Sequence, residues 1–299
     1  MNPTQELDCF AVSAPGVEPF TAKELSSLGL IADSSQPDTA VPGDDRQGET
    51  GGVAFRTTLH GLYLANYHLR TASRVLVRLG EFHAAKFVEM RRKAGHLEWE
   101  KYLAPGQPLG VRVTSRSSRL YHTRAVTESI TQAVGDRLGR LPDLVPFDEE
   151  SGEHQRLVVR ILDNNCTLSI DSSGEMLHRR GYRLATAKAP LRETLAAAVI
   201  MASGWQTRSP LLDPFCGSRT IPIEAAMIGR NMAPGLGRRF AAEDWSTLSV
   251  ALWNETREQA RDLARPKLEE RIIGTDIDGS ALDLARFHAG QAGVADDIH

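Results

Sequence analysis

Hydrophobic positions in the first 181 residues alternate between the two-residue period of strands and the 3.6-residue period of helices. Strands are predicted at residues 9–12, 52–56, 74–79, 109–114, 157–162 and 166–170, and helices at 17–28, 59–67, 84–93 and 121–138. Residues 33–51 are polar and rich in Gly, Pro and Asp, which predicts a surface loop. No glycine-rich phosphate loop joins these elements. The pattern therefore predicts an α+β half, built as two small sheet-and-helix layers.

The order of elements changes after residue 190. A helix is predicted at 191–200, a strand at 211–213, a helix at 220–230, a strand at 272–274 and a helix at 280–291. A long connection separates the first strand and its helix from the second strand. Strands that alternate with helices are typical of a doubly wound parallel sheet, whose ligands bind at the carboxyl ends of the strands. The second half is therefore predicted to be α/β.

Bulk composition narrows the class of protein. The chain has 299 residues, of which 41% are hydrophobic and 24% charged, as in ordinary globular proteins. It contains no apolar run long enough for a transmembrane helix, and its first ten residues do not resemble a secretory signal. Its three cysteines are far apart and lack metal-ligand spacing, so we expect no disulfide framework and no metal site. A cytoplasmic protein is the resulting expectation.

Charge is distributed unevenly along the chain. Residues 66–140 carry fourteen Lys or Arg against six acids, a net charge of +8, although the whole chain has a formal charge of −3. A basic segment within an acidic protein is the pattern expected of a polyanion binder. The alternative is a solvated surface whose charge is balanced by neighbouring acidic modules. Composition alone does not separate the two.

Acidic residues follow both strands of the predicted parallel sheet. Asp213 ends the first strand and precedes a turn and a helix, so backbone amides and a helix N-terminus would face a ligand there. A carboxylate in that loop can bind an ammonium group. Asp276 follows the second strand, where carboxylates bind ribose hydroxyls in nucleotide sites, and Asp278 is the second choice. The alternatives are a plain α/β turn at the first strand and a helix N-cap at the second.

These stretches together resemble a known family of enzymes. Residues 213–218 (DPFCGS), with Thr220 and 224–226 (EAA), resemble the cofactor motif of class I amino-methyltransferases acting on RNA and DNA. The THUMP-domain methyltransferases that make N2-methylguanine in large-subunit ribosomal RNA form one subset, and many of its members carry the label N6-adenine-specific DNA methylase. Further stretches are similar to that subset: 14–18, 69–76, 120–123, 178–183, 231–236 and 274–278.

The resemblance implies a cofactor, a substrate and a set of site residues. The cofactor would be S-adenosylmethionine, and the substrate the N2 amine of a guanine in large-subunit ribosomal RNA. The residues around the methionine end of the cofactor would be Asp213, Phe215, Cys216, Gly217, Ser218 and Thr220. Asp276 would bind the ribose of the cofactor, and Pro190, Leu191 and Thr194 would border the same pocket. Cys216 is interpreted as a packing residue and Glu224 as structural. RNA would be contacted by Arg116, Arg119, Tyr121, His122, Arg124, Arg179 and Arg180. For Tyr121, a core aromatic at the start of a helix is the competing interpretation.

The same resemblance divides the chain into three parts. A ferredoxin-like segment is expected at 1–60, a THUMP RNA-binding domain at 61–180, and the N-terminal part of a Rossmann-like methyltransferase domain at 186–299. The chain differs from the family pattern at Arg219, where members usually have glycine, and this places the affinity for the cofactor in doubt. The alternative is that Arg219 pairs with the carboxylate of the cofactor.

The end of the sequence is the second difference from the family. The sequence stops where a third strand is expected, and it contains no Asn-Pro-Pro-Tyr-type motif to position a target amine. We therefore expect a truncated enzyme and name no catalytic residue. Two rival hypotheses remain: an RNA-binding fragment without activity, and a DNA adenine-N6 methylase.

Overall fold

The computed structural model describes residues 5–31, 51–149, 152–183 and 191–299. The predicted polar loop at 33–51 lies, apart from Gly51, outside the described residues, and so does Pro190. Within the described ranges no helix is both long and apolar enough to cross a membrane.

Seven strands of the N-terminal half form one sheet. They are β1 (Leu7–Ser13), β2 (Gly52–Thr57), β3 (Ala72–His83), β4 (Leu109–Arg116), β5 (Leu144–Val145), β6 (Gln155–Leu162) and β7 (Asn165–Asp171). Their order is β2-β1-β3-β7-β6-β4-β5, and only the β4 pairs with β5 and β6 are parallel. All six predicted strands are present, and β5 was not predicted because two residues carry no periodic signal.

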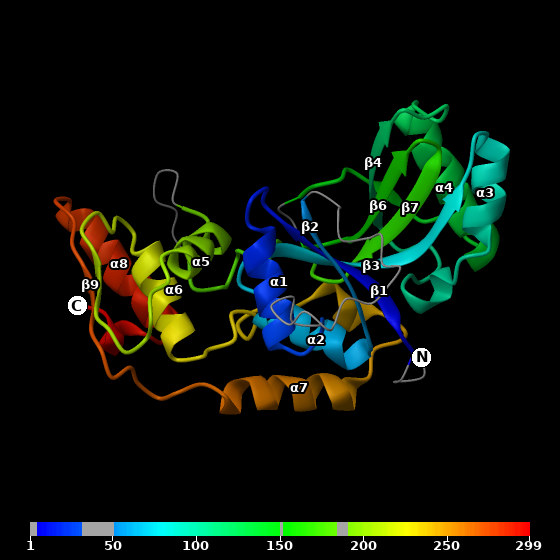
Figure 1. The fold of residues 1–299 in the computed structure, drawn as a ribbon. Helices are drawn as coiled ribbons and strands as arrows, with labels where there is room; N and C mark the ends of the chain where they lie inside the picture. Colours follow the sequence, from blue (N-terminus) through cyan, green and yellow to red (C-terminus); the bar gives the residue numbers. More distant parts are fainter. Residues whose placement is uncertain (1–4, 32–50, 150–151, 184–190) are drawn as a thin grey trace, which may run out of the picture.

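The prediction of two separate sheet layers is wrong because β3 is twelve residues long. Its first part pairs with β1, where Val77 faces Cys9, and its last part pairs with β7, where His83 faces Asn165. At about 3.3 Å per residue, a strand of this length reaches across two ordinary modules. It therefore joins the two groups of strands into one sheet, as Figure 1 shows.

Helices cover this sheet with apolar stripes, as their spacing predicts. They are α1 (Glu18–Ser27), α2 (Leu59–His68), α3 (Phe87–Gly95) and α4 (Thr123–Leu138), with a short 3-10 turn at Trp99–Lys101. Leu25, Leu62, Met90 and Ile130 are fully buried and bring one residue from each helix into a single core. Burial of such side chains contributes about 1.5–3 kcal/mol each, which makes this core the main source of stability.

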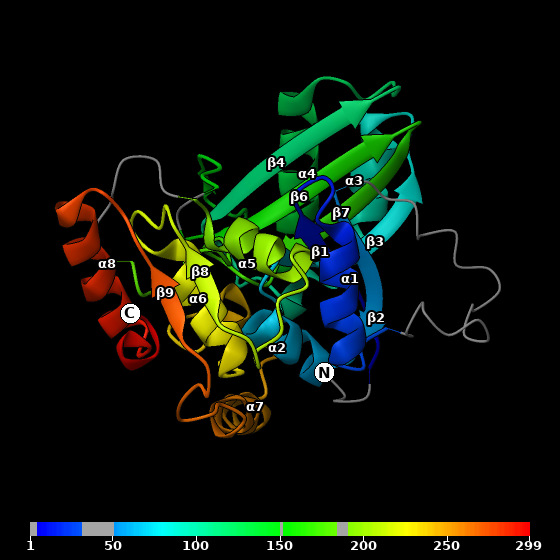
Figure 2. The same cartoon turned by 60° about the vertical axis from the view of Figure 1, so that its left-hand side comes forward.

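The C-terminal half has the predicted β-α-β-α order. Its elements are α5 (Glu193–Ala202), β8 (Leu211–Asp213), α6 (Thr220–Gly229), α7 (Val250–Asp262), β9 (Ile272–Gly274) and α8 (Gly279–Gln291), with 3-10 turns at Ala241–Asp244 and Ala295–Asp297. β8 and β9 are parallel neighbours, and Ile298 forms a further parallel bridge to Ile272. Figure 2 shows the two strands side by side among α5, α6 and α8.

Helix α7 was not predicted. Most of the hydrophobic residues between α6 and β9 do not pack in the core of the C-terminal half, and their spacing gave no clear helical period. The connection packs instead on the N-terminal half (Figure 1). The Trp253 ring lies 4.5 Å from Tyr63 and 5.0 Å from Tyr67 between centroids, and 5.6 Å from Phe240. These aromatic contacts place α7 against α2. The connection thus holds the two halves together.

Gly235 explains part of the sequence motif in this connection. Its amide donates a hydrogen bond of 2.9 Å to the carbonyl of Tyr67. A Cβ atom at this position would lie 2.8 Å from the Asn66 carbonyl oxygen and 2.8 Å from the Phe240 ring. Only glycine allows the backbone to approach α2 this closely.

Candidate functional site

The parallel pairing of β8 and β9 brings two loops to one edge of their sheet. Asp213 faces Gly274 in the register, so the turn at 214–219 and the stretch at 275–278 both begin at this edge. Two backbone hydrogen bonds join them: Thr275 N donates to Asp213 O, and Cys216 N donates to Thr275 O, each at 2.9 Å. The predicted loop and the second strand-end carboxylate therefore lie together.

Asp276 is fixed by backbone amides of both loops. Its Oδ2 accepts a hydrogen bond from Gly217 N at 2.8 Å, and its Oδ1 accepts one from Asp278 N at 2.9 Å. These amides lower the pKa of the Asp276 carboxyl, the Asp278 amide contributing most. The side chain is therefore ionised at neutral pH, and each oxygen keeps a further acceptor position.

Asp213 has the opposite electrostatic character. Its Oδ1 accepts a hydrogen bond from Phe215 N at 3.1 Å. Partial burial raises the pKa of the Asp213 carboxyl, the Phe215 amide opposes this, and the nearby charge of Asp276 adds to it. A carboxylate in such a setting gains from a cation placed beside it. The loop therefore offers a site for an ammonium group.

Cys216 lies behind the loop and not at its surface. It is 6% exposed, and burial raises the pKa of its thiol more than the neighbouring Arg219 lowers it. The thiol is therefore protonated at neutral pH, which agrees with its interpretation as a packing residue. Phe215, by contrast, is 88% exposed, while Ser218 is partly exposed.

Asp278 caps helix α8. Its carboxylate accepts hydrogen bonds from Ser280 N at 2.9 Å and from Ala281 N at 3.4 Å. The helix N-cap, which was the alternative interpretation of this residue, is the geometry observed. Asp276 does not cap this helix. Asp278 is therefore the N-cap of α8, and Asp276 is the carboxylate held between the two loops.

Thr220 and the start of α5 are joined by a residue that the sequence did not single out. Arg183 Nη2 donates to Thr220 Oγ1 at 2.6 Å and to the Leu191 carbonyl at 3.4 Å. Its Nη1 lies 3.3 Å from the buried Glu193 carboxylate. Thr194 is buried beside Glu193, and Leu191 is exposed. Arg183 thus fixes α5 against the first turn of α6, and the only signal was its place in the GYR stretch.

Arg219 occupies the N-cap of α6 in the left-handed backbone region, with φ of 62°. Glycine adopts this conformation freely, whereas other residues do so at a cost. The predicted importance of glycine at this position therefore has a backbone reason. The Arg219 side chain is 5% exposed, so it folds inward from the turn.

Five of the predicted RNA-contacting residues lie at one end of the large sheet. Arg116, Arg119, Tyr121, His122 and Arg124 are all exposed. Their loop is held by the turn between β6 and β7, because Asp163 N donates to Arg116 O and Arg119 N donates to Asn164 Oδ1. The Tyr121 and His122 rings lie 4.1 Å apart between centroids. Tyr121 is 64% exposed, so it is not a core aromatic.

Arg179 and Arg180 lie away from that end, between the two halves. Arg179 is exposed and lies 3.3 Å from the Glu175 carboxylate. Arg180 is 4% exposed, donates to the Arg70 carbonyl at 2.5 Å and lies 3.5 Å from Glu224. The prediction of an RNA contact is wrong for Arg180, because its guanidinium is buried against its own chain. Through Arg70, just after α2, and Glu224, on α6, Arg180 forms a joint between the two halves.

Glu224, on α6, is the acidic partner of Arg180 in this joint between the two halves. It is fully buried and lies within 3.3 Å of the Tyr182 hydroxyl. Arg70 extends the joint, since its Nη2 donates to the Met232 carbonyl at 2.6 Å. These buried contacts agree with the structural role that the sequence predicts for Glu224.

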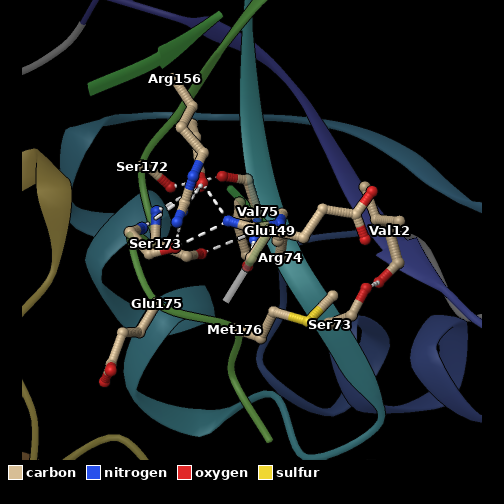
Figure 3. Close-up of polar contacts among 12 residues, drawn as sticks. Val12, Ser73, Arg74, Val75, Glu149, Arg156, Ser172, Ser173, Glu175 and Met176 are labelled. Atoms are coloured by element: carbon tan, nitrogen blue, oxygen red, sulfur yellow. Dashed lines mark hydrogen bonds and ion pairs between the residues drawn. The ribbon is translucent and has the colours of Figure 1, made fainter. Parts of the chain in front are cut away.

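A second buried network lies inside the large sheet (Figure 3). Asp171 Oδ2 accepts hydrogen bonds from Arg74 and from Arg156, the latter at 3.2 Å. Both guanidinium groups also donate to the Gly174 carbonyl. Arg74 belongs to the +8 segment, but it is only 7% exposed. Its charge is therefore bound inside the protein and does not face a polyanion.

Other basic residues of the segment are balanced by acids at the surface. Arg91 pairs with Asp136 at 2.7 Å, and Arg137 pairs with Glu100 at 2.5 Å. Because Asp136 and Glu100 belong to the same segment, these pairs are already counted in its net charge of +8 and do not decide between the two interpretations. In the 116–124 loop Arg124 pairs with Glu128 at 3.2 Å, while Arg116 and Arg119 are exposed and form no ion pair with a described residue.

Comparisons with known proteins agree with this arrangement. Three family models match: the RlmL ferredoxin-like domain at residues 8–76, the THUMP domain at 84–171, and the RMKL-like methyltransferase domain at 180–299. A Bacillus subtilis protein named “Putative RNA methyltransferase YpsC” is 33% identical over 292 residues, which is 96% of this chain and 71% of that protein.

Solved structures show the same likeness. A Listeria monocytogenes protein, described as a predicted N6-adenine-specific DNA methylase, is 37% identical with a TM-score of 0.83, over 98% of this chain and 74% of that one. SMU.472, whose crystal structure contains SAH, is 32% identical with a TM-score of 0.81, over 99% and 74%. TrmN from Thermus thermophilus, at 18% identity and a TM-score of 0.64, shares the fold.

These findings confirm two of the expectations from the sequence. The fold class is a ferredoxin-like and THUMP N-terminal half followed by a Rossmann-like methyltransferase domain. The cofactor is S-adenosylmethionine.

Proposed function

The chain belongs to the family of THUMP-domain, S-adenosylmethionine-dependent methyltransferases, and on that premise we propose that it methylates the N2 amine of a guanine in large-subunit ribosomal RNA. The observation that carries the proposal is the meeting of the 213–219 loop with Asp276 at one sheet edge, in a chain that also presents an exposed basic loop. The first feature suits a nucleoside-type cofactor and the second suits RNA.

The residues at the sheet edge fit the cofactor chemically. Asp276 is ionised and has acceptor positions left for ribose hydroxyls, and Asp213 has a raised pKa that a cofactor ammonium group would offset. No hydrogen bond is recorded for the Thr220 and Ile221 amides within the described ranges, as is normal for the first turn of a helix. Such amides can hold an anionic group.

Exposed apolar side chains flank the same edge. Phe215 is 88% exposed, and Ile277 is fully exposed next to Asp276. The Phe215 ring can stack on a purine and Ile277 can pack against it, and a ligand held between them would be shielded from water. The bound cofactor supplies a methyl group already activated by its sulfonium. The residues around it therefore need to bind, orient and exclude water.

The exposed loop at one end of the large sheet supports the choice of RNA. Arg116, Arg119 and Arg124 supply positive charge for phosphates, and the Tyr121 and His122 rings can stack on unpaired bases. We propose these five residues, with the exposed Arg179 nearer the joint, as RNA contacts. Affinity from such contacts should fall steeply with salt.

The proposed division of labour follows the three parts expected from the sequence. Residues 1–60 and 61–180 would form the ferredoxin-like and THUMP modules that bind RNA, and 186–299 would bind the cofactor. Asp213, Phe215, Cys216, Gly217, Ser218, Thr220 and Asp276 would surround it, with Leu191 and Thr194 at the border and Asp278 supporting the second loop. Three free cysteines are consistent with a cytoplasmic location.

Methyl transfer to RNA is the direct test. The protein would be incubated with tritiated S-adenosylmethionine and ribosomal RNA from cells lacking the gene, and the labelled nucleoside would be identified after digestion. Label in N2-methylguanine of the large-subunit RNA is expected, with Asp276→Ala as the matched negative control. Label in another nucleoside, or in small-subunit RNA alone, would contradict the proposed substrate.

A DNA adenine-N6 methylase is the second candidate, because the Listeria relative carries that description. Both reactions use an exocyclic amine, so the cofactor site does not separate them. The same assay with unmethylated DNA does: labelled DNA with unlabelled RNA would favour this candidate. If S-adenosylmethionine fails to bind in calorimetry while RNA binds, the chain acts as an RNA-binding module only.

A further inference from the structure

Arg219 is a buried cation that lacks a full set of partners. Its residue is 5% exposed, and the Nε atom is buried without a hydrogen-bond partner. It interacts with the Cys216 thiol but, within the described part of the chain, forms no ion pair with an acid, although Asp213 and Asp276 follow the two neighbouring strands. A buried guanidinium that donates fewer hydrogen bonds than it can is costly unless a ligand completes the set.

The position of the side chain is at the cofactor edge of the sheet. A Cβ atom built on Gly274 would lie 3.4 Å from Arg219 Nε and 3.2 Å from Cys216 Sγ. The Nε atom therefore lies near Cys216 and the end of β9, next to the loop that Asp276 holds through Gly217.

Two features of the backbone make the arginine unfavourable without a ligand. The residue has φ of 62°, a conformation that glycine adopts more easily. It is also the N-cap of α6, where the helix dipole disfavours a positive charge. An anion beside the guanidinium would offset the second cost and satisfy the free N–H group.

S-adenosylmethionine carries one such anion, the carboxylate of its methionine moiety. We propose that Arg219 binds this carboxylate, and so makes the site select ligands with an amino-acid end. The inference rests on the proposed cofactor site at the 213–219 loop. Asp213 would take the ammonium group of the same moiety, so that the two charges of the amino acid meet two opposite charges of the loop.

Ligand truncation combined with substitution tests this pairing. Calorimetry would measure binding of S-adenosylhomocysteine, which has the carboxylate, and of 5′-methylthioadenosine, which lacks it. In Arg219→Gly we expect S-adenosylhomocysteine to lose roughly tenfold to a hundredfold in affinity, as for a lost hydrogen-bonded charge. Binding of 5′-methylthioadenosine should change by less than about threefold. Arg219→Lys should fall between, because an ammonium keeps the charge but not the fork.

Glycine at this position relieves the backbone strain, so the variant should fold at least as well as the natural chain. Arg208→Gly, at an exposed turn of the same half, is the matched control and should leave both affinities unchanged. Equal or tighter S-adenosylhomocysteine binding by Arg219→Gly would overturn the inference, and so would equal losses for both ligands. If the natural chain binds neither ligand, the proposed cofactor site fails as well.

Discussion

The two halves of the molecule use their polar residues in different ways. In the N-terminal half, charged side chains such as Arg74, Arg156 and Asp171 are buried and bonded to each other, and they lock a large continuous sheet. In the C-terminal half, Asp213, Asp276 and Phe215 stand at an open edge above a two-stranded sheet with a smaller core. Stability is concentrated in the first half, and the residues suited to chemistry are concentrated in the second.

The connection between α6 and β9 joins these unequal halves. Phe240, Trp245 and Trp253 belong to the core of the N-terminal half, although they lie within the sequence of the methyltransferase domain. Arg238 adds hydrogen bonds to the carbonyls of Met176 and Ser173, and burial lowers the pKa of its guanidinium to about 10. The smaller half thus gains stability from the larger one.

Removing Asp171 should have the largest effect on folding. Asp171→Ala leaves two buried guanidinium groups without their carboxylate, so we expect a loss of about 4 kcal/mol in the free energy of unfolding. Urea denaturation measures it. Asp136→Ala removes a carboxylate that also pairs with an arginine, but at the surface, and should cost less than about 1 kcal/mol. Equal losses in the two variants would contradict the contrast between buried and exposed charges.

Trp253→Ala tests whether α7 is stabilised by the N-terminal half. The substitution empties the space between Tyr63, Tyr67 and Phe240, and it should cost about 3 kcal/mol. Hydrogen exchange should become faster in α2 as well as in α7. Leu263→Ala, at the exposed end of the same helix, should leave both helices protected. Faster exchange in α6 and α8 alone would place α7 energetically with the C-terminal half.

Asp276→Ala should weaken ligand binding with little effect on stability. Loss of the ribose acceptor should raise the Kd for S-adenosylhomocysteine about tenfold, measured by calorimetry. The unfolding midpoint of the N-terminal half should stay the same, because Asp276 contacts only the two loops of its own half. Asp283→Ala on α8 removes an exposed carboxylate nearby and should leave the Kd unchanged. Equal Kd values in the two variants would exclude Asp276 from the site.

His68 should give the smallest of these effects, as a dependence of stability on pH. Burial, with a contribution from Arg70, lowers the pKa of the His68 imidazole from 6.5 to about 4. Between these values the unfolded chain binds more protons than the folded chain, so stability falls as the pH is lowered from 6.5 towards 4. After allowance for its partial exposure, we expect a loss of about 1 kcal/mol at pH 5.

His68→Gln should remove that part of the pH dependence. The exposed His122→Gln serves as the control and should leave it in place. Chemical denaturation at pH 7 and pH 5 measures both variants. A pH dependence that is unchanged in His68→Gln would show that other groups cause it.

Periodic patterns predicted most of the fold because most elements bury one regular face. Every predicted helix and strand is present, with ends displaced by a few residues, as at β3 and α3. The missed elements lacked a local signal. Helix α7 buries Trp253 and Ala260 against a distant module, and β5 has two residues. The single sheet was missed because strand pairing across modules leaves no trace in periodicity.

The site was predicted in part for the same reason. Strand ends followed by acids indicated Asp213 and Asp276, since parallel strands bring their carboxyl ends together. The contact of the buried Arg180 with Glu224 could not be predicted from the sequence, and neither could the contacts of Arg183 with α5 and α6. Both are long side chains whose contacts depend on the packing of separate elements. The left-handed backbone at Arg219 was indicated only through the family's glycine.

A crystal structure of the protein with S-adenosylhomocysteine would show directly whether the cofactor lies at the edge formed by β8 and β9. We expect the ribose hydroxyls within hydrogen-bond distance of the Asp276 carboxylate and the amino-acid end of the ligand beside the 213–219 loop. Density for the ligand at any other place, or a loop whose side chains leave no room for an adenosine, would contradict it.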